Sequence, residues 1–211
     1  MKGRFINWLD ERTGVVDFYH KQIAYELPEG VSYWHMFSGL TIGCITLQII
    51  SGFYMLWYFV PDPTLAHQSI RAMCRLSFTG MLMRNIHRWS ATFGAAFVIL
   101  HALHVLSRRA FRSPRELNWW SGMALGIIFV LFLITGVILP WDWRSYWELI
   151  IWADWANLLP GIGGFLKDNI IMQFSLGRNF AVHIMFLPAL LFTVLGFHII
   201  VMRRLGLSER V

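Results

Sequence analysis

The chain has 211 residues, of which 56% are hydrophobic and only 14% are charged, against about 25% charged in typical soluble domains. This composition excludes an ordinary soluble domain and indicates an integral, multi-pass membrane protein. The net charge of +6 would suggest nucleic acid binding in a soluble protein, but here the lysines and arginines collect beside apolar segments. Membrane orientation and anionic lipid explain charges in that position, so lipid is expected as a partner and nucleic acid is not.

Residues 1–22 mix both charge signs and contain no long apolar run, unlike a secretory signal or a transit peptide. The first apolar segment is therefore expected to direct membrane insertion. Four segments are long enough to cross a bilayer, since a span needs about 20 mostly apolar residues. They cover residues 33–59, 79–106, 118–139 and 179–202, and prolines or arginines end each one.

Residues 141–178, between the third and fourth spans, carry aromatic and acidic side chains that suit short helices at the membrane interface. The predicted fold is therefore all-α. We expect a single membrane domain over residues 1–211, built as a four-helix bundle with short interfacial helices between spans three and four.

Positive charge is distributed unevenly over the two sides that four spans define. The segments before span one, after span two and after span four share one side and hold eleven of the eighteen lysines and arginines. By the positive-inside rule this is the n-side, the cytoplasm or its equivalent, and both termini are expected there. The opposite side is the p-side.

Four histidines fall in two pairs, His87 with His101 and His183 with His198. On an α-helix, 14 residues rise about 21 Å and make nearly four whole turns, so the first pair shares one face at two depths. The second pair is 15 residues apart and overshoots by about 60°, which packing or a small distortion at Pro188 would absorb. Because spans two and four run the same way, His87 should lie level with His183 and His101 with His198.

Ionisable side chains at membrane depth are costly and usually functional, and two imidazoles at each level would ligate the iron of a haem. The matched spacing favours two stacked haems. One alternative is a set of histidines that hydrogen-bond across a helix bundle. Another is zinc, but histidine pairs without cysteine or carboxylate do not complete a four-ligand site.

Small and cationic residues accompany these histidines. Glycines recur at similar intervals on spans one and three: Gly39, Gly52, Gly122 and Gly136. Because glycine lacks Cβ, these positions would give a haem plane room, or they would serve as small-residue helix contacts. Three arginines lie near the p-side histidines in the sequence: Arg84, Arg88 and Arg178. They would pair with haem propionates or anchor the chain at the membrane interface.

Several motifs carry a resemblance to a known family. They are IHRWSATFGAAFVILHALHV at 86–105, PREL at 114–117, the glycines Gly122 and Gly136, LPWD at 139–142, and RNFAVH at 178–183 with the distal His198. Together they resemble cytochrome b of quinol-oxidising bc-type complexes. The four-span length and the 15-residue spacing resemble the short, split form, cytochrome b6, whose remaining spans belong to a separate subunit IV.

The resemblance implies roles for particular residues. His87 and His183 would ligate the p-side, low-potential haem b, and His101 and His198 the n-side, high-potential haem b. Arginines would lie near the haems, on the p-side Arg84, Arg88 and Arg178, and on the n-side Arg203. The segment after LPWD would help to form the p-side quinol pocket, near Trp141, Asp142 and Tyr146.

The same resemblance implies a dihaem electron-transfer subunit of a proton-translocating quinol:cytochrome c or plastocyanin-type oxidoreductase. In this Q cycle, electrons would pass from p-side quinol through both haems to n-side quinone. The isolated chain would be incomplete as an enzyme. Its expected partners are a subunit IV-like protein, a Rieske iron–sulfur protein and a c-type cytochrome, in a dimeric complex of a bacterial cytoplasmic or thylakoid-type membrane.

Two departures from cytochrome b6 stand out at the start of span one. Met36 occupies the place of a cysteine that covalently holds an extra c-type haem, and a thioether bond needs a thiol, which argues against a third haem here. Ser38 replaces a family glycine. Two other functions remain open: a dihaem b subunit of a different respiratory or dehydrogenase assembly, and a haem-free helical transporter or scaffold.

Overall fold

The computed structural model describes residues 2–23, 33–173 and 175–205. These residues contain helices and turns and no strand, which confirms the all-α prediction. The chain divides into two compact units, Met1–Val31 with Glu209–Val211 and Ser32–Ser208. The assignment of one domain to the whole chain stays a prediction.

The first unit contains two short helices, α1 (Lys2–Thr13) and α2 (Val15–Ile23). Gly14 separates them at a positive φ of 61°, a conformation that glycine adopts without strain. The carboxylate of Asp10 then accepts hydrogen bonds from the backbone N–H groups of Val16 (2.8 Å) and Asp17 (3.2 Å). Asp10 therefore caps the first turn of α2.

Within the described residues, four helical segments of the second unit are long and apolar enough to cross a membrane. The first three are α3 (Met36–Leu56), which a 3₁₀ turn at Tyr33–His35 precedes, α5 (Phe78–Ser107) and α6 (Glu116–Ile138). The fourth runs continuously through α9 (Leu176–Ala181), a π-helix (Val182–Phe186) and α10 (Leu187–Leu205). The four predicted spans are thus confirmed, with the first ending three residues earlier than expected.

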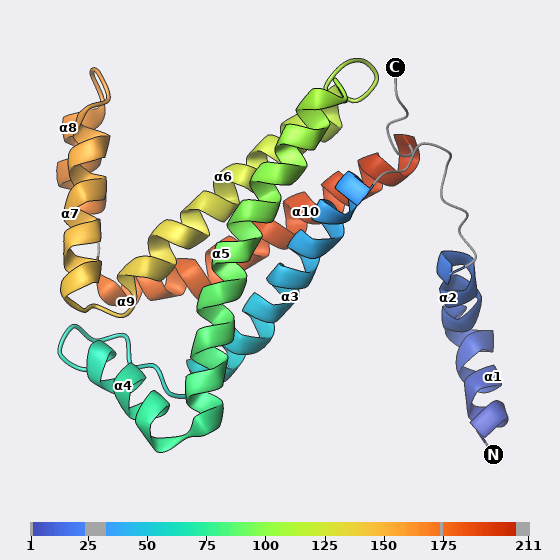
Figure 1. Ribbon diagram of the computed structural model, residues 1–211, viewed down its shortest axis with the longest axis horizontal. Coiled ribbons are helices and arrows are strands. Elements are labelled where there is room, and N and C mark those ends of the chain that lie inside the picture. Colours follow the sequence, from blue (N-terminus) through green and yellow to red (C-terminus); the bar gives the residue numbers. More distant parts are fainter. Residues whose placement is uncertain (1, 24–32, 174, 206–211) are drawn as a thin grey trace. The chain divides into compact units, whose positions relative to one another are not determined.

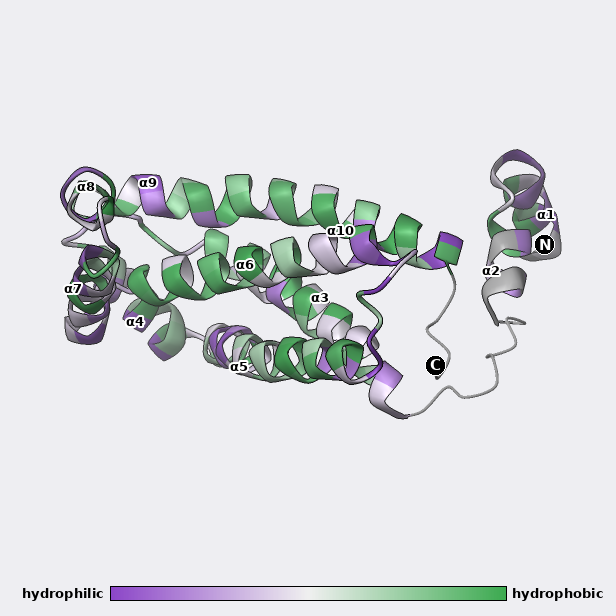
Figure 2. Cartoon of the chain, turned by 90° about the horizontal axis from the view of Figure 1, so that it is seen from above, coloured by the Kyte–Doolittle hydropathy of each residue, from purple (hydrophilic) through white to green (hydrophobic). Residues whose placement is uncertain are grey.

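The long helices pack as two pairs, α3 along α5 and α6 along α10, as Figure 1 shows. Only 11–22% of the most apolar window of each span is buried within the chain. Apolar residues cover most of the length of these helices, and polar residues gather toward their ends (Figure 2). The exposed apolar surface requires cover from lipid or from other apolar groups.

Shorter helices lie at one end of this bundle (Figures 1 and 2). Between spans three and four they are α7 (Trp143–Asn157), α8 (Gly163–Phe165) and a π-helix (Leu166–Ile171), as the sequence predicts. A further helix that was not predicted is α4 (Ala66–Leu76), which packs on α5 and buries Ala66, Ile70 and Met73. This segment has too few apolar residues to suggest a membrane span, and only the spacing of those residues indicates a helix.

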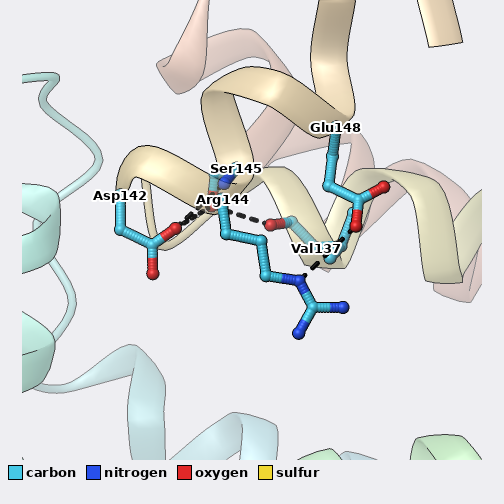
Figure 3. A network of polar contacts seen from close by, with 5 residues as sticks. All are labelled: Val137, Asp142, Arg144, Ser145 and Glu148. Carbon is cyan, nitrogen blue, oxygen red and sulfur yellow. Dashed lines mark hydrogen bonds and ion pairs between the residues drawn. The ribbon is translucent and has the colours of Figure 1, made fainter. Parts of the chain in front are cut away.

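The turn that joins α6 to α7 is held by side chains. Pro140 has no N–H to donate to the last turn of α6, and Trp141 adopts a left-handed φ of 48°. The carboxylate of Asp142 accepts a hydrogen bond from the Ser145 N–H (2.9 Å), which caps α7. The Ser145 hydroxyl lies between this carboxylate (3.0 Å) and the Val137 carbonyl oxygen (2.9 Å), so it links the ends of the two helices (Figure 3).

Candidate haem-binding site

The structure brings the four sequence-predicted histidines together in two levels. His87 on α5 and His183 on the fourth span lie close enough for their rings to interact electrostatically. The same holds for His101 and His198, nearer the other end of the same helices. Each level therefore offers two imidazoles from two helices, the ligand number that the iron of a b-type haem needs.

The ring of His87 is oriented by two adjacent residues of α3. The Ser51 hydroxyl lies 3.0 Å from His87 Nδ1 and donates its own hydrogen to the Leu47 carbonyl oxygen at 2.5 Å. Because that hydrogen is committed, the hydroxyl oxygen accepts from Nδ1–H. This fixes the tautomer that leaves Nε2 free to ligate a metal. A Cβ at the next residue, Gly52, would lie 3.2 Å from His87 Cε1, so the glycine makes room for the ring.

The same arrangement recurs on α6 for the ring of His183. The Thr135 hydroxyl lies 2.8 Å from His183 Nδ1 and donates to the Leu131 carbonyl oxygen at 2.7 Å. A Cβ at Gly136 would lie 2.9 Å from His183 Cε1, closer than real contacts allow. The Asn179 side chain, 0% exposed, donates to the Thr135 carbonyl oxygen at 2.9 Å, so it holds this end of α6 in place.

At His198 the supporting pair is Ser121 and Gly122. The Ser121 hydroxyl lies 2.8 Å from His198 Nδ1 and donates to the Asn118 carbonyl oxygen at 2.9 Å. A Cβ at Gly122 would lie 3.4 Å from His198 Cε1, an ordinary contact distance. Three of the four rings are therefore oriented by a hydroxyl residue that directly precedes a glycine.

His101 is the exception. Its Nδ1 is buried and has no hydrogen-bond partner among the described residues. Ser38 and Gly39 occupy the corresponding sequence pattern. The Ser38 hydroxyl donates to the His35 carbonyl oxygen (2.8 Å) but does not pair with His101 Nδ1. A Cβ at Gly39 would meet no described heavy atom within 4 Å, so no close packing requires this glycine.

A further histidine pair lies beyond His101. The Nε2 atoms of His35 and His104 are 3.5 Å apart, and the ring of Trp34 stacks on that of His104, which is 8% exposed.

At the level of His87, the side chain of Gln48 connects α3 to α5. It donates to the His87 carbonyl oxygen and to the Ser90 hydroxyl (2.7 Å), which holds α3 against α5.

The spacing of His183 and His198 is explained by the π-helix at Val182–Phe186. A π-helical turn accommodates one extra residue compared with an α-helical turn. The 15-residue interval therefore acts as a 14-residue interval, like that from His87 to His101. The distortion lies before Pro188 and not at Pro188, the position that the sequence suggested.

The polar residues predicted near the p-side haem and the quinol pocket differ in exposure. Arg84 is half-buried, while Arg88 and Arg178 are exposed, as is Arg203 at the other end. Trp141 lies among residues of α6, α7 and α9 with no space for a water molecule between them, whereas Tyr146 is 50% exposed and packs on Trp147.

The Asp142 carboxylate, predicted near the quinol pocket, is engaged as the helix cap. Burial alone would raise the pKa of this carboxyl. Hydrogen bonds from the backbone and hydroxyl of Ser145 and the nearby His67 outweigh burial and hold the pKa below its usual value.

Sequence reasoning missed several residues that orient the histidines: Ser51, Ser121, Thr135, Gln48 and Asn179. The sequence signal for the first three is their position directly before Gly52, Gly122 and Gly136, the regularly spaced glycines.

The described residues fit a pair of haems. Their donor set is two facing imidazoles at each level, and no group of three or more histidine, cysteine or acidic residues among them could hold a metal ion. A Cβ at Gly136 would overlap the His183 ring, and a Cβ at Gly52 would crowd the His87 ring. Met36, 55% exposed, presents a thioether where covalent haem attachment would require a thiol.

Comparisons with known proteins agree with this geometry. A family model described as cytochrome b/b6/petB matches residues 22–206. Cytochrome b6 of Synechococcus sp. (strain JA-3-3Ab) is 33% identical over 208 residues, 96% of each chain. The menaquinol:cytochrome c reductase cytochrome b subunit of Bacillus subtilis (strain 168) is 31% identical over 221 residues, 99% of each chain.

A solved structure titled hyperthermophilic respiratory Complex III superposes with a TM-score of 0.87 at 27% identity. The match covers 97% of this chain and 56% of the other, so this chain spans about half the length of that structural relative. On the family match and the relatives of similar length, this chain belongs to the cytochrome b family.

Proposed function

We propose that this chain is the dihaem electron-transfer subunit of a quinol-oxidising complex of the cytochrome bc type. The observation that carries the proposal is the set of three histidines whose Nδ1 atoms are held by a Ser or Thr hydroxyl, which leaves Nε2 free to ligate iron. Two non-covalent b-type haems would supply one-electron transfer from p-side quinol oxidation to n-side quinone reduction.

The chain's own residues provide ligands and orientation. His87 and His183 would hold the p-side haem, and His101 and His198 the n-side haem. Cations that would neutralise the propionates are Arg84, Arg88 and Arg178 on the p-side and Arg203 on the n-side. Hydroxyl partners keep the Nδ1 atoms of His87, His183 and His198 protonated, and the glycine after each hydroxyl residue leaves space beside the ring.

The turn at Trp141 and Asp142 would form part of the p-side quinol pocket with Tyr146. Because Asp142 and Ser145 bind the ends of α6 and α7 together, this wall of the pocket is held rigidly. The pocket needs further walls, and the exposed surfaces of the spans offer places for other subunits.

The complex would contain a subunit IV-like membrane protein, a Rieske iron–sulfur protein and a c-type cytochrome as electron acceptor. The B. subtilis relative supports this composition in part, because its name specifies menaquinol and cytochrome c as substrates. We expect a dimeric complex in a bacterial cytoplasmic or thylakoid-type membrane, surrounded by lipid, with both termini on the n-side. Proton translocation would follow from quinol oxidation and quinone reduction on opposite sides.

A haem count on the purified complex tests this proposal. Reduced-minus-oxidised spectra should show b-type α-bands, and a pyridine haemochrome assay should give two haems b for each chain. His183→Ala should lose one haem, whereas His20→Ala in α2 should keep both. Two intact haems in His183→Ala would contradict the ligand assignment.

Two further readouts test the finer parts of the proposal. Haem staining of a denaturing gel should leave this chain unstained, because Met36 provides no thiol. Co-purification of a Rieske protein would separate a bc-type complex from a dihaem subunit of another assembly.

A further inference from the structure

The hydrogen bonds to the four histidines are unequal between the two levels, and the inference drawn from this inequality rests on the proposed haem ligation. At the p-side level both Nδ1 atoms have a hydroxyl acceptor, Ser51 at 3.0 Å and Thr135 at 2.8 Å. At the n-side level only His198 has one, Ser121 at 2.8 Å, while the buried Nδ1 of His101 has no partner among the described residues.

A hydrogen bond from Nδ1–H makes an imidazole a stronger electron donor, because it moves the ring toward imidazolate and raises its basicity at Nε2. Stronger donors stabilise ferric iron over ferrous iron and so lower the reduction potential of a haem. Each hydroxyl here also donates to a carbonyl oxygen of its own helix, and such chained hydrogen bonds polarise one another.

Thr135, the hydroxyl partner of His183, has a further contact that supports its position. Asn179 is fully buried, and its side-chain amide donates to the Thr135 carbonyl oxygen at 2.9 Å. This bond crosses from α9 to the last turn of α6. Asn179 therefore keeps the Thr135 hydroxyl in position against His183.

We propose that Ser51, Thr135 and Ser121 are positioning residues that set the potentials of the two haems. With two hydrogen-bonded ligands, the p-side haem has the lower potential. With one, the n-side haem has the higher potential. Electrons then move downhill from the p-side to the n-side without any difference in ligand type. The nearby cations Arg84 and Arg88 would act in the opposite direction, so the hydroxyl contribution has to be isolated by substitution.

The test is redox potentiometry of the b-type α-bands in the purified complex, after a haemochrome assay has shown two haems. Thr135→Val keeps the shape and removes the hydroxyl, and Thr135→Ser restores it. Ser51→Ala and Ser121→Ala remove the other two partners. Thr193→Val is the matched control, because the Thr193 hydroxyl also donates to the carbonyl four residues earlier, Ala189 at 2.8 Å, but is exposed and bonds no histidine.

We expect Thr135→Val and Ser51→Ala to raise the potential of the lower-potential haem, and Ser121→Ala to raise that of the higher-potential haem. Each shift should change the oxidised-to-reduced ratio at fixed ambient potential by up to about tenfold, which is about 59 mV for a one-electron couple. Thr135→Ser and Thr193→Val should leave both potentials unchanged.

Unchanged potentials in Ser51→Ala and Thr135→Val, with both haems still bound, would overturn the proposal. So would a p-side haem, identified by its loss in His183→Ala, that has the higher potential of the two. If Thr135→Val fails to assemble, Ser51→Ala and Ser121→Ala decide the matter at each level. A wild-type complex without b-type haem would overturn the proposed function itself, and the spectrum recorded first distinguishes that result.

Discussion

At the scale of single residues, a buried imidazole nitrogen without a hydrogen-bond partner costs folding free energy. A hydroxyl and the glycine after it meet two needs at once at three of the histidines. The hydroxyl binds Nδ1, and the glycine leaves space beside Cε1. The remaining nitrogen, Nε2, is then left for a ligand that the protein does not itself supply.

The tightest of these contacts makes a direct prediction. Gly136→Ala would place a Cβ 2.9 Å from His183 Cε1, so the ring has to move and the p-side haem should be lost. Haem content for each purified chain, measured by pyridine haemochrome, should fall from two to one. Gly126→Ala on the same helix is the control, because a Cβ there meets no described heavy atom within 4 Å. Equal haem content in the two variants would refute this role of Gly136.

The histidines and their glycines were predictable because costly or small residues at a fixed interval are rare by chance. The hydroxyl partners were not, since serine and threonine in membrane helices commonly bond only a carbonyl of the preceding turn, as Thr193 does. The sequence also does not distinguish Ser38 from Ser51, because both directly precede a glycine. Only packing decides that Ser51 reaches a histidine ring and Ser38 does not.

At the scale of whole elements, the fourth span shows how the protein keeps its histidines in register. The sequence predicted that packing or a small distortion at Pro188 would absorb the overshoot of the 15-residue interval, and the structure has a π-helix at Val182–Phe186. Periodicity reveals that one residue is surplus. Periodicity does not reveal where the helix accommodates the surplus residue, because the position depends on the neighbours that satisfy the shifted carbonyl groups.

Two single-residue deletions test this account, because both shorten the interval between His183 and His198 from 15 to 14. Deleting Met185, which is 67% exposed within the π-helix, should restore a plain α-helix and keep both haems. Deleting Thr193, in the regular α10, leaves the π-helix in place and turns His198 by about 100°. That variant should lose the n-side haem, and equal haem content in the two deletions would count against the π-helix as the source of the register.

The turn between α6 and α7 gives a prediction about stability. Asp142→Ala removes the cap of α7 and should cost about 1 kcal/mol of unfolding free energy, whereas Asp142→Asn should keep most of it. Thermal unfolding of the purified protein in detergent measures the difference. Asp154→Ala is the control. It breaks an exposed ion pair with Lys167, which contributes little at a surface.

The same cap predicts a pH dependence. Hydrogen bonds and the nearby His67 hold the pKa of Asp142 below its usual value, so its charged form is favoured by folding. The resulting stabilisation is fully present above the ordinary carboxyl pKa of about 3.9 and is lost as the pH falls through the lower pKa of the folded state. The stability difference between wild type and Asp142→Ala should therefore shrink at acidic pH. A difference that grows on acidification would contradict this sign.

At the scale of the whole molecule, the packed interior is small for a chain of this length. Most of each span's apolar surface faces outward, while the polar residues that matter lie between paired helices. An open bundle of this kind suits a subunit that receives cofactors between its helices and other proteins on its outer faces. The length match of 96–99% to the short relatives, against 56% to the Complex III chain, fits the same division.

Membrane orientation can be read from one native cysteine. Cys74 on α4 is a half-buried free thiol between the first two spans, and Cys44 is buried in α3. Because eleven of the eighteen lysines and arginines belong to the other side, Cys74 should face the p-side. A membrane-impermeant maleimide should label it in intact cells or spheroplasts and not in sealed inverted vesicles. Arg112→Cys, at an exposed position between α5 and α6, placed in a Cys74→Ser background, should give the reverse pattern. Labelling of Cys74 only in inverted vesicles would reverse the assignment of the two haem levels to the p-side and the n-side.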